Sequence, residues 1–376
     1  MRFLHTGDWH VGKGLAGRSR YQEHEAALAE ITRIAETHEV DLVLVAGDLF
    51  DHSSPPPEAE RIVYHTLSNL ARIAPVAVVA GNHDGDRRLE ALAPLFKALG
   101  VHIRAFVSEE PLLIEASTGE RARIATLPWL SQRHIVKAEQ LMNFDADDLS
   151  GIYSERVRRI IEALCSGFDD SAVNLLLGHT TIAGGELGGG ERTAQTIFDY
   201  WVDTSAFPPS AHYVALGHLH RPQAMAGACP VRYCGSPLQL DFSDRDEAKQ
   251  VLLIEASPGT PAEVTEVLLG SGRRLRTLIG TFEQIQAQAG TTGDDYLRVI
   301  VKGPARTGLG DEIRALFPHA VKVILDAPVA DGGREERAAH TQVSPPELFS
   351  AFLSDQGVED PALLDLFKEL YEECVA

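Results

Sequence analysis

Residue types that bind metal ions recur in five short segments of this sequence of 376 residues. Each segment places a Gly next to Asp, Asn or His. The side chains that could act as ligands or at a reacting centre are Asp8, His10, Asp48, Asn82, His83, His179, His218 and His220. This set offers carboxylate, amide and imidazole groups but no thiolate, which argues against a structural zinc site.

The number of these groups indicates more than one ion. Seven ligands exceed what one catalytic ion needs, and they suit two ions that share a bridging carboxylate and keep positions open for water and substrate. Mixed oxygen and imidazole ligands favour Mn²⁺ or Fe²⁺, with Zn²⁺ as an alternative. Two such ions activate water near neutral pH and neutralise the charge of a phosphate, so the predicted reaction is hydrolysis of a phosphoester.

The elements that must position these groups are short apolar runs rich in Val, Leu and Ile. Each segment follows one run, and we predict buried strands at Arg2–His5, Leu42–Ala46, Val76–Ala80, Asn174–Leu177 and Tyr213–Leu216. In α/β sheets, ligands bind outside the carboxyl ends of the strands, so these ends should bring the candidate residues to one rim. Any one segment alone could be a turn or hold a structural histidine, and the metal-site prediction rests on their conjunction.

Helical patterns alternate with the strands through the first 256 residues, which predicts an α/β layered domain. Apolar residues recur at helical spacing in Tyr21–Thr37, and Ser54–Glu58 should open a second helix because Pro is tolerated in a first turn. Later elements are expected, in chain order, as strands at Val231–Cys234 and Gln250–Glu255, a smaller unit at about 275–330, a polar linker at 330–341 and short helices at 347–353 and 361–373.

The composition excludes some classes of protein. A hydrophobic fraction of 44% and a charged fraction of 23% are ordinary globular values and exclude a disordered chain. No apolar run reaches the ~18 residues of a membrane helix, and the start has no apolar signal core, so we expect a soluble, cytoplasmic protein with no membrane partner. The cysteines at 165, 229, 234 and 374 form no C-x-x-C pair and should be reduced, with a 229–234 bridge as the less favoured alternative.

Five motifs of this sequence resemble those of the calcineurin-like metallophosphoesterases: Asp8–Lys13, Gly47–Asp51, Gly81–Asp84, Gly178–Thr180 and Gly217–His220. The D-x-H-x-G-K opening, the D-L-F-D form and the added C-terminal units are similar to those of the SbcD family of DNA-repair nuclease subunits. The resemblance implies a layered metallophosphoesterase β-sandwich flanked by helices, with a smaller α+β capping domain and C-terminal helices. It implies a nuclease domain at 1–270, a DNA-capping domain at 271–335, and a linker with ATPase-docking helices at 336–376.

The same resemblance implies roles for the site residues. Two Mn²⁺ ions, or other divalent ions, would be held in each subunit. One would be bound by Asp8, His10, Asp48 and His220, and the other by Asp48, Asn82, His179 and His218. His83 would face the scissile phosphate and stabilise it or protonate the leaving oxygen, a role that suits a pKa near neutrality. Asp51 matches a residue that orients this His in many related enzymes. Some double-strand-break nucleases carry His there, so Asp51 and the adjacent His52 stay open alternatives.

The resemblance also implies substrates and partners. It implies 3′-to-5′ exonuclease activity on double-stranded DNA and endonuclease activity on hairpins and single strands, in DNA repair, recombination and replication. The implied partner is an SbcC-like ATPase of the SMC family, which alone uses ATP, in a nucleoid-associated heterotetramer that contains a homodimer of this subunit. The C-terminal helices could instead pack back on the chain's own body. A general metal-dependent phosphodiesterase or phosphatase, and a metal-bound scaffold without catalysis, are the alternative functions.

Three further features have both a functional and a plain structural interpretation. Basic residues after the first and third motifs could contact DNA phosphates or be ordinary solvated charges: Lys13, Arg18, Arg20, Arg87 and Arg88. Gly184–Gly190 is not a P-loop, because no Gly-Lys-Ser/Thr follows, and we favour a flexible loop over one that orders on DNA. Trp129 is expected to pack in the core and not to stack on a base.

The net charge of −20 argues against a nucleic-acid partner, because polyanion binders are usually basic. The charge is unevenly spread, however. Residues 271–340 hold ten basic and nine acidic residues, whereas 341–376 hold one basic and eight acidic residues. Bound divalent ions would further offset the acidity at the metal site. We therefore expect DNA binding that depends on the metal centre, the basic loops and the partner, and weak binding by this subunit alone.

Overall fold

The structure is a computed structural model that describes residues 1–116, 119–131, 146–189, 191, 201–244, 248–304 and 306–326, with short stretches at 349–350, 352–353, 362–364 and 366–368. The chain divides into two compact units. The first consists of Met1–Thr277, Thr292–Arg298 and His319–Lys322, and the second of Leu278–Thr291, Val299–Pro318 and Val323–Ala376. The first unit carries all five motifs.

A first six-stranded sheet holds the strands that precede three of the motifs. In order across the sheet, its strands are β14 (Glu263–Leu268), β13 (Gln250–Glu255), β1 (Arg2–Thr6), β2 (Leu42–Val45), β3 (Val76–Val79) and β4 (Val101–Arg104). Strands β1 to β4 run parallel, as their continuous Val- and Leu-rich composition favours. Strand β13 pairs antiparallel with β1, and β14 pairs antiparallel with β13 at the edge.

A second six-stranded sheet holds the strands that precede the other two motifs. Across it lie β11 (Gln223–Met225), β12 (Val231–Tyr233), β10 (Tyr213–Gly217), β7 (Val173–His179), β6 (Arg121–Leu127) and β5 (Leu112–Glu115). Strands β12, β10, β7 and β6 are parallel, and β11 and β5 close the edges in the antiparallel direction. The predicted strands therefore exist, but they belong to two sheets.

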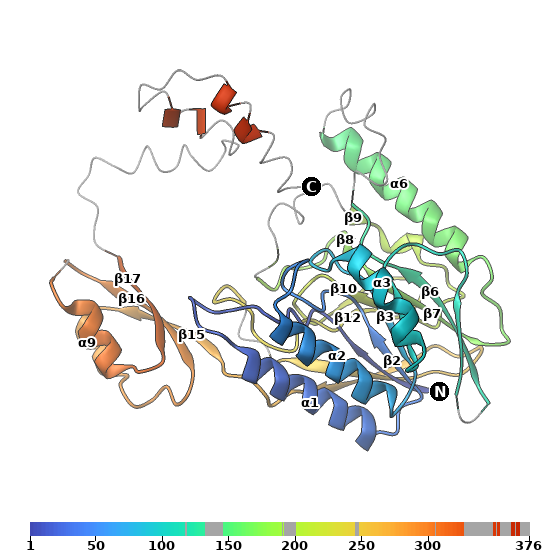
Figure 1. The fold of residues 1–376 in the computed structure, drawn as a ribbon, viewed down its shortest axis with the longest axis horizontal. Helices are drawn as coiled ribbons and strands as arrows, with labels where there is room; N and C mark the ends of the chain where they lie inside the picture. The colour runs from blue at the N-terminus through green and yellow to red at the C-terminus, as the bar shows by residue number, and fades with distance from the viewer. Residues whose placement is uncertain are drawn as a thin grey trace. The chain divides into compact units, whose positions relative to one another are not determined.

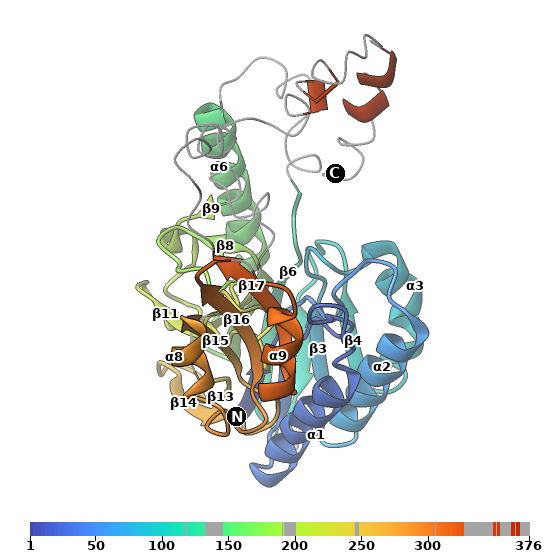
Figure 2. The same cartoon turned by 90° about the vertical axis from the view of Figure 1, so that its left-hand side faces the viewer.

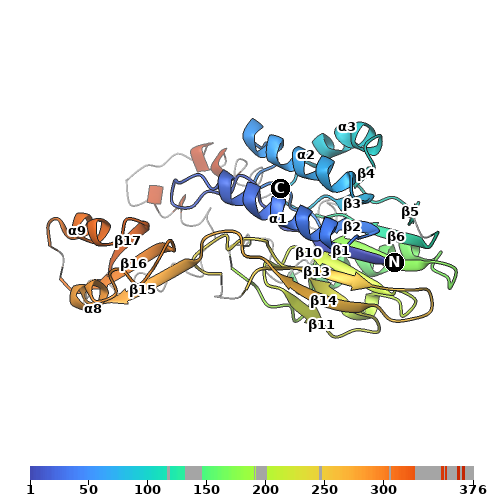
Figure 3. The same ribbon diagram turned by 90° about the horizontal axis from the view of Figure 1, so that it is seen from below.

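Helices cover the outer face of the first sheet (Figures 1 and 3). The first sheet packs against α1 (Tyr21–Thr37), α2 (Pro57–Ala71) and α3 (Asp86–Lys97), and the second against α6 (Ala146–Cys165). Figure 2 shows α1, α2 and α3 together on one side of β3 and β4. Helix α2 begins at Pro57, because a first-turn residue needs no N–H for the helix ladder.

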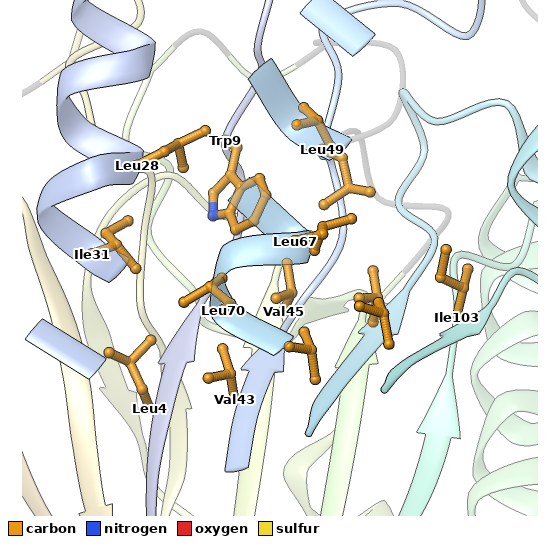
Figure 4. Close-up of a cluster of buried hydrophobic side chains, with 14 of the residues drawn as sticks. Leu4, Trp9, Leu28, Ile31, Val43, Val45, Leu49, Leu67, Leu70 and Ile103 are labelled. Atoms are coloured by element: carbon orange, nitrogen blue, oxygen red, sulfur yellow. The ribbon is translucent and has the colours of Figure 1, made fainter. Parts of the chain in front are cut away.

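Alternating side chains join these layers into a sandwich. On β2, Leu42 and Leu44 face the second sheet, whereas Val43 and Val45 face the helices. Figure 4 shows the helix-side cluster, in which leucines and isoleucines of α1 and α2 surround Val43 and Val45. The layer order helix, sheet, sheet, helix confirms the predicted metallophosphoesterase β-sandwich.

A smaller sheet follows the sandwich along the chain. It consists of β15 (Leu275–Gly280), β16 (Tyr296–Lys302) and β17 (Ala320–Asp326), and α9 (Leu309–Leu316) lies alongside it in Figures 1 and 2. A capping box of Thr281 and Gln284 starts the short helix α8 (Phe282–Gln286). The division between the two compact units passes through this sheet, and the domain limits predicted at residues 270 and 335 stay a prediction.

The remaining short elements are β8 (Thr181–Ile182), β9 (Trp201–Val202) and a 3₁₀ turn at Thr204–Ala206. The predicted linker at 330–341 and most of the two C-terminal helices lie outside the described residues. Of these helices, the described stretches are helical, and the rings of Phe349 and Phe367 stack with centroids 4.1 Å apart. Among the described helices, none is long and apolar enough to cross a membrane. Cys229 and Cys234 are free thiols, so the alternative bridge is not formed.

Candidate metal centre

The loops after β1, β2 and β3 of the first sheet meet the loops after β7 and β10 of the second. Main-chain hydrogen bonds join the first two loops, from Asp8 N to Gly47 O and from His10 N to Asp48 O, both at 3.0 Å. The second sheet attaches through His179 Nδ1, which lies 2.7 Å from Ala46 O. The eight candidate residues therefore gather at one rim, as predicted, although that rim spans two sheets.

Glycine makes this close approach of the two sheets feasible. A Cβ atom on Gly217, at the end of β10, would overlap the carbonyl oxygen of Ala46 at the end of β2. A Cβ on Gly81 would overlap the carboxylate of Asp48 in the same way. The Gly in these motifs thus lets one backbone reach the ligands of the next loop.

The backbone of the candidate ligands is strained. Asp8, His10 and Asp48 have φ angles of +49°, +45° and +48°, in the left-handed region that non-glycine residues rarely adopt. Trp9 holds the first two in place, because its indole is fully buried among the helix-side residues of Figure 4 and donates from Nε1 to Thr6 Oγ1 at 3.0 Å. Such strain persists only where packing enforces it, and it is typical of functional sites.

Asp48 lies at the centre of the cluster. Its Oδ2 is 3.4 Å from His10 Nε2 and 3.4 Å from His179 Nε2, and its Oδ1 accepts the main-chain N–H of His83 at 2.8 Å. Potential metal ligands form two groups that share this carboxylate, one with His10 and His83 and one with Asp8 and His179. Asp8 approaches His179 through Nδ1, which already bonds Ala46 O, so this contact does not decide which ion Asp8 would serve.

Two imidazoles point their ring nitrogens at each other, an arrangement that suits a cation bound between them. His10 Nε2 and His220 Nε2 lie 3.0 Å apart. The opposite ring atoms face acceptors, since His10 Nδ1 lies 3.7 Å from the Asp51 carboxylate and His220 Nδ1 lies 2.9 Å from Gly189 O. A proton on each Nδ1 leaves a lone pair on each Nε2, and a cation between them removes the repulsion.

A second convergence surrounds the amide of Asn82. Its Oδ1 lies 3.0 Å from His179 Nε2 and 2.9 Å from His218 Nδ1. His218 is placed by its main-chain N–H, which donates to Asp8 Oδ1 at 2.9 Å, and by Trp129, whose ring stacks on it at 4.8 Å. The expectation that Trp129 packs in the core is therefore wrong, because it is only partly buried and packs against a candidate ligand.

The electrostatics of the cluster favour positive charge. Burial lowers the pKa of His179, but the carboxylates of Asp48 and Asp8 outweigh burial and raise it to about 9. Burial would raise the pKa of Asp48, yet the nearby His179, His83 and His10 hold it well below its usual range. An ionised carboxylate that is almost fully buried needs a cationic partner, so the donor set fits divalent ions.

His83 is held by the main chain of Asp51 and not by its side chain. The Nδ1 atom of His83 lies 2.8 Å from Asp51 O. The Asp51 carboxylate instead lies 3.2 Å from Lys13 Nζ, 3.2 Å from His52 Nε2 and 3.7 Å from His10 Nδ1. The group that contacts His83 Nδ1 is therefore a carbonyl oxygen and neither of the two side chains that were the alternatives, Asp51 and His52. The Asp51 carboxylate lies beside His10 instead.

Two carboxylates outside the candidate set also shape the centre. Asp84 accepts from Gly81 N at 2.9 Å, Phe50 N at 3.1 Å and Leu49 N at 3.3 Å, and it thereby ties the second loop to the third. Burial and the charge of Asp48 raise the pKa of Asp84 to about 7. Asp84 is the last residue of the Gly81–Asp84 motif, and this position is the sequence feature from which a role at the centre could have been predicted. The second carboxylate, Glu191, follows the Gly-rich loop and carried no comparable signal.

The basic residues proposed for DNA contact fall into different environments. Arg20 corrects the prediction, because it is 2% exposed and bonds Glu23 Oε2 at 2.8 Å and the carbonyl of Gln239, so it cannot reach a phosphate. Arg88 pairs with Glu60 at 3.0 Å, and Lys13 pairs with Asp51. The side chains of Arg18 and Arg87 are exposed.

Comparison with known proteins assigns the chain to a family. The family model of the calcineurin-like phosphoesterases matches residues 1–222, which include all five motifs. The chain is 40% identical over 280 residues to the SbcD subunit of the SbcCD nuclease of Bacillus subtilis (strain 168), an alignment that covers 73% of this chain and 71% of that protein. The chain belongs to the SbcD family.

Other SbcD proteins match over similar lengths. The SbcD subunit of the Escherichia coli (strain K12) SbcCD nuclease is 32% identical over 298 residues, 77% of this chain and 73% of that protein. The protein of the same name from Rhodobacter capsulatus is 35% identical over 277 residues, 69% and 67% of the two chains. As an SbcD family member with this centre, the chain is a metal-dependent phosphodiesterase of the nuclease class.

Proposed function

We propose that this chain is the catalytic subunit of an ATPase–nuclease complex and hydrolyses DNA phosphodiesters at the centre around Asp48. One observation carries the proposal. The buried Asp48 carboxylate lies 3.4 Å from imidazoles on both sides, His10 and His179, and so belongs to two neighbouring groups of potential ligands. A shared carboxylate between two ions is an arrangement suited to the hydrolysis of phosphoesters.

The proposed cofactor is a pair of Mn²⁺ ions. Asp8, His10, Asp48 and His220 would hold one ion, and Asp48, Asn82, His179 and His218 the other. The facing Nε2 atoms of His10 and His220 support the first set, and the convergence on Asn82 Oδ1 supports the second. When bound, such ions lower the pKa of a coordinated water and neutralise phosphate charge.

His83 is proposed to act on the scissile phosphate. Its main-chain N–H donates to Asp48 Oδ1 and its Nδ1 donates to Asp51 O, so the residue is fixed from two directions. A proton held on Nδ1 leaves Nε2 to stabilise the phosphate or to transfer a proton to the leaving oxygen. Asp51 would contribute by its carbonyl oxygen to His83 and by its carboxylate to His10.

The proposed substrates are double-stranded DNA ends, hairpins and single strands, cut in DNA repair, recombination and replication. The proposed partner is an SbcC-like ATPase, because the relatives are by name subunits of SbcCD. In this proposal, residues 271–335 cap the DNA and residues 336–376 dock on the ATPase. The near-neutral charge of the first segment and the acidity of the second support these separate roles.

A homodimer of this subunit is also proposed, and α3 offers a surface for it. Its outward face carries Ala91, Pro94 and Leu95, and Leu99 follows the helix; Leu95 and Leu99 are 69% and 56% exposed. Two such stripes bury their apolar area against each other in a symmetric pair. Sedimentation of the full chain should give a dimer, and a monomer at all concentrations would contradict this part of the proposal.

The function is tested with the purified chain and Mn²⁺, alone and together with an SbcC-like ATPase. The substrates are double-stranded DNA with free ends, a hairpin, a single strand and a small generic phosphodiester. We expect metal-dependent cleavage of DNA that the ATPase increases. Cleavage of the generic diester alone would indicate a general phosphodiesterase, and bound metal without any hydrolysis would indicate a scaffold.

A further inference from the structure

The main chain and the Nδ1 atom of His220 are held by groups that lie outside the five motifs. The N–H of His220 donates to Glu191 Oε1 at 3.0 Å, and Nδ1 lies 2.9 Å from Gly189 O. The carbonyl of His220 accepts from Ser236 N at 3.2 Å and from Lys249 Nζ at 3.3 Å. Together, these hydrogen bonds fix the orientation of the His220 imidazole.

Glu191 organises the side of His220 that faces the Gly-rich loop. Its side chain is only 3% exposed, and its two oxygens accept three main-chain N–H groups. Besides the bond from His220 N, Oε1 accepts from Gly188 N at 2.8 Å and Oε2 accepts from Gly189 N at 2.7 Å. Main-chain donors of this kind bind a carboxylate strongly, so Glu191 fixes the peptide units of the loop relative to the motif.

The glycines of the loop let it lie directly on the motif. A Cβ on Gly188 would come within 2.8 Å of Arg221 N and 3.1 Å of His220 Cβ. Gly189 has a φ of +111°, and a Cβ there would come within 2.6 Å of Asp244 N. The interpretation of Gly184–Gly190 as a plain flexible loop is therefore corrected for Gly188 and Gly189, where the absence of a side chain permits close packing.

We propose that Glu191 is a positioning residue for the metal ligand His220. By fixing Gly189, it presents a carbonyl oxygen that holds the proton on His220 Nδ1 and directs Nε2 toward His10, 3.0 Å away. Metal-bound histidines commonly donate their second ring N–H to such an acceptor, and loss of that outer partner typically costs about 10- to 100-fold in metal affinity. This inference rests on the proposed metal centre.

The first test measures Mn²⁺ binding by calorimetry with the full chain carrying Glu191→Gln. The amide keeps the size of the side chain but offers one acceptor oxygen in place of two, so one main-chain N–H is left without its acceptor. We expect the affinity for one Mn²⁺ to fall about 10- to 100-fold. DNA hydrolysis should need correspondingly more Mn²⁺ for half-maximal rate, with kcat at saturating Mn²⁺ close to that of the unaltered chain.

A matched control lies on the same loop. Glu186 is 57% exposed and pairs with Arg221, so Glu186→Gln makes the same chemical change without a contact to His220. We expect the Mn²⁺ affinity of this variant to match that of the unaltered chain. If both Gln variants, or neither, weaken Mn²⁺ binding, Glu191 has no special role.

A double-mutant cycle with His220→Ala decides whether Glu191 acts through His220. If it does, Glu191→Gln causes no further loss of Mn²⁺ affinity once His220 is absent. An equal loss with and without His220 would overturn the inference. Should Glu191→Gln not fold in EDTA, Glu191→Asp, which keeps both acceptor oxygens on a shorter arm, replaces it in the same cycle.

The cycle also separates this inference from the proposal on which it rests. If His220→Ala binds Mn²⁺ as tightly as the unaltered chain, the proposed metal centre is wrong. If His220→Ala weakens binding and Glu191→Gln does not, the metal centre stands and only the positioning role of Glu191 is wrong.

Discussion

The two sheets of the sandwich bring different chemistry to the same rim. The loops of the first sheet carry both carboxylates and the amide, together with two imidazoles: Asp8, His10, Asp48, Asn82 and His83. The loops of the second sheet carry only imidazoles: His179, His218 and His220. Among the candidate ligands, the carboxylates therefore come from one sheet and the other supplies only imidazoles, and the complete donor set exists only where the two sheets close on each other.

The two groups of loops are also held in place differently. Those of the first sheet bond to one another through their main chains, and the Asp84 carboxylate ties the second loop to the third. In the second sheet, His179 bonds Ala46 of the first sheet, and His220 depends on Glu191 and the Gly-rich loop. We therefore expect the first sheet to determine whether metal binds and the second to tune how tightly it binds.

The largest expected effect tests this comparison directly. Asp48→Ala removes the shared carboxylate and should abolish binding of both ions, with DNA hydrolysis reduced by more than about 1,000-fold because several kcal/mol of charge stabilisation are lost. His218→Ala, from the second sheet, should weaken Mn²⁺ binding and leave part of it. Metal content after gel filtration measures both.

Asp311→Ala is a suitable control for these variants, because that side chain is 89% exposed on α9. It should keep the metal content and activity of the unaltered chain. Equal metal loss in the Asp48 and His218 variants would contradict the division of roles between the sheets.

His83 provides a further test of the difference between the two sheets, because it lies among the first-sheet ligands but is proposed to act on the substrate. His83→Gln should lower kcat by about 100- to 10,000-fold, the usual contribution of a general acid or a base, while Mn²⁺ binding stays within a factor of two. The exposed His65→Gln on α2 serves as the control. A loss of bound metal in the His83 variant would reassign this residue as a ligand.

The next effect concerns the stability of the first-sheet side of the molecule. Burial and the charge of Arg20 lower the pKa of His24 on α1 to about 4. Between pH 7 and 5, the unfolded chain protonates this histidine and the folded chain does not, so stability falls as the pH falls. The residue should account for about 2 kcal/mol of that loss, at 1.36 kcal/mol per pKa unit.

Urea denaturation in EDTA at pH 7 and pH 5 measures this contribution. Replacing His24 by Gln should reduce the loss of unfolding free energy between the two pH values by that amount. The exposed His65→Gln should leave the loss unchanged. An unchanged pH dependence in His24→Gln would mean that this histidine is already protonated in the folded chain.

The smallest expected effect is on DNA affinity. Arg18 is exposed on a first-sheet loop and Arg87 is exposed in the first turn of α3, so the double variant Arg18→Ala with Arg87→Ala should weaken DNA binding several-fold. The slope of log K against log salt should change by about 0.9 for each phosphate that is no longer neutralised. Arg33→Ala, a change at an exposed site on α1, should leave both quantities unchanged. An unaltered slope in the double variant would place the DNA elsewhere.

Much of this fold follows from local patterns. The α1 helix has the predicted bounds, and the five ligand-bearing strands were recognisable because a buried apolar run, a Gly and a polar residue follow one another. Helix α3 was not predicted, because Pro94 within it disfavours a helix and the exposed Leu95 and Leu99 blur the alternation between apolar and polar faces. Strand β14 was missed because Glu263, Thr265 and Glu266 leave it without a buried run.

The site was predictable in its ligand types but less so in its supports. Arg20 resembles a surface cation in sequence, yet its guanidinium is buried and donates hydrogen bonds to Glu23 and to the distant Gln239 carbonyl. The carboxylates of Asp84 and Glu191 act by accepting main-chain N–H groups from other loops, a contact that depends on tertiary structure. Only Asp84, at the end of a motif, has a sequence feature that points to such a role. The carbonyl of Asp51 has no such feature, because any residue type offers that atom.

The pairing of β1 has a consequence for biosynthesis. This first strand lies between β2 and β13, and its residue Arg2 pairs with Glu255. A chain still being translated therefore lacks a neighbour of its first strand, as well as His218 and His220, until most of its length has been made. Contacts so distant in sequence form late. The donor set of the metal centre is therefore complete only after the second sheet has been made.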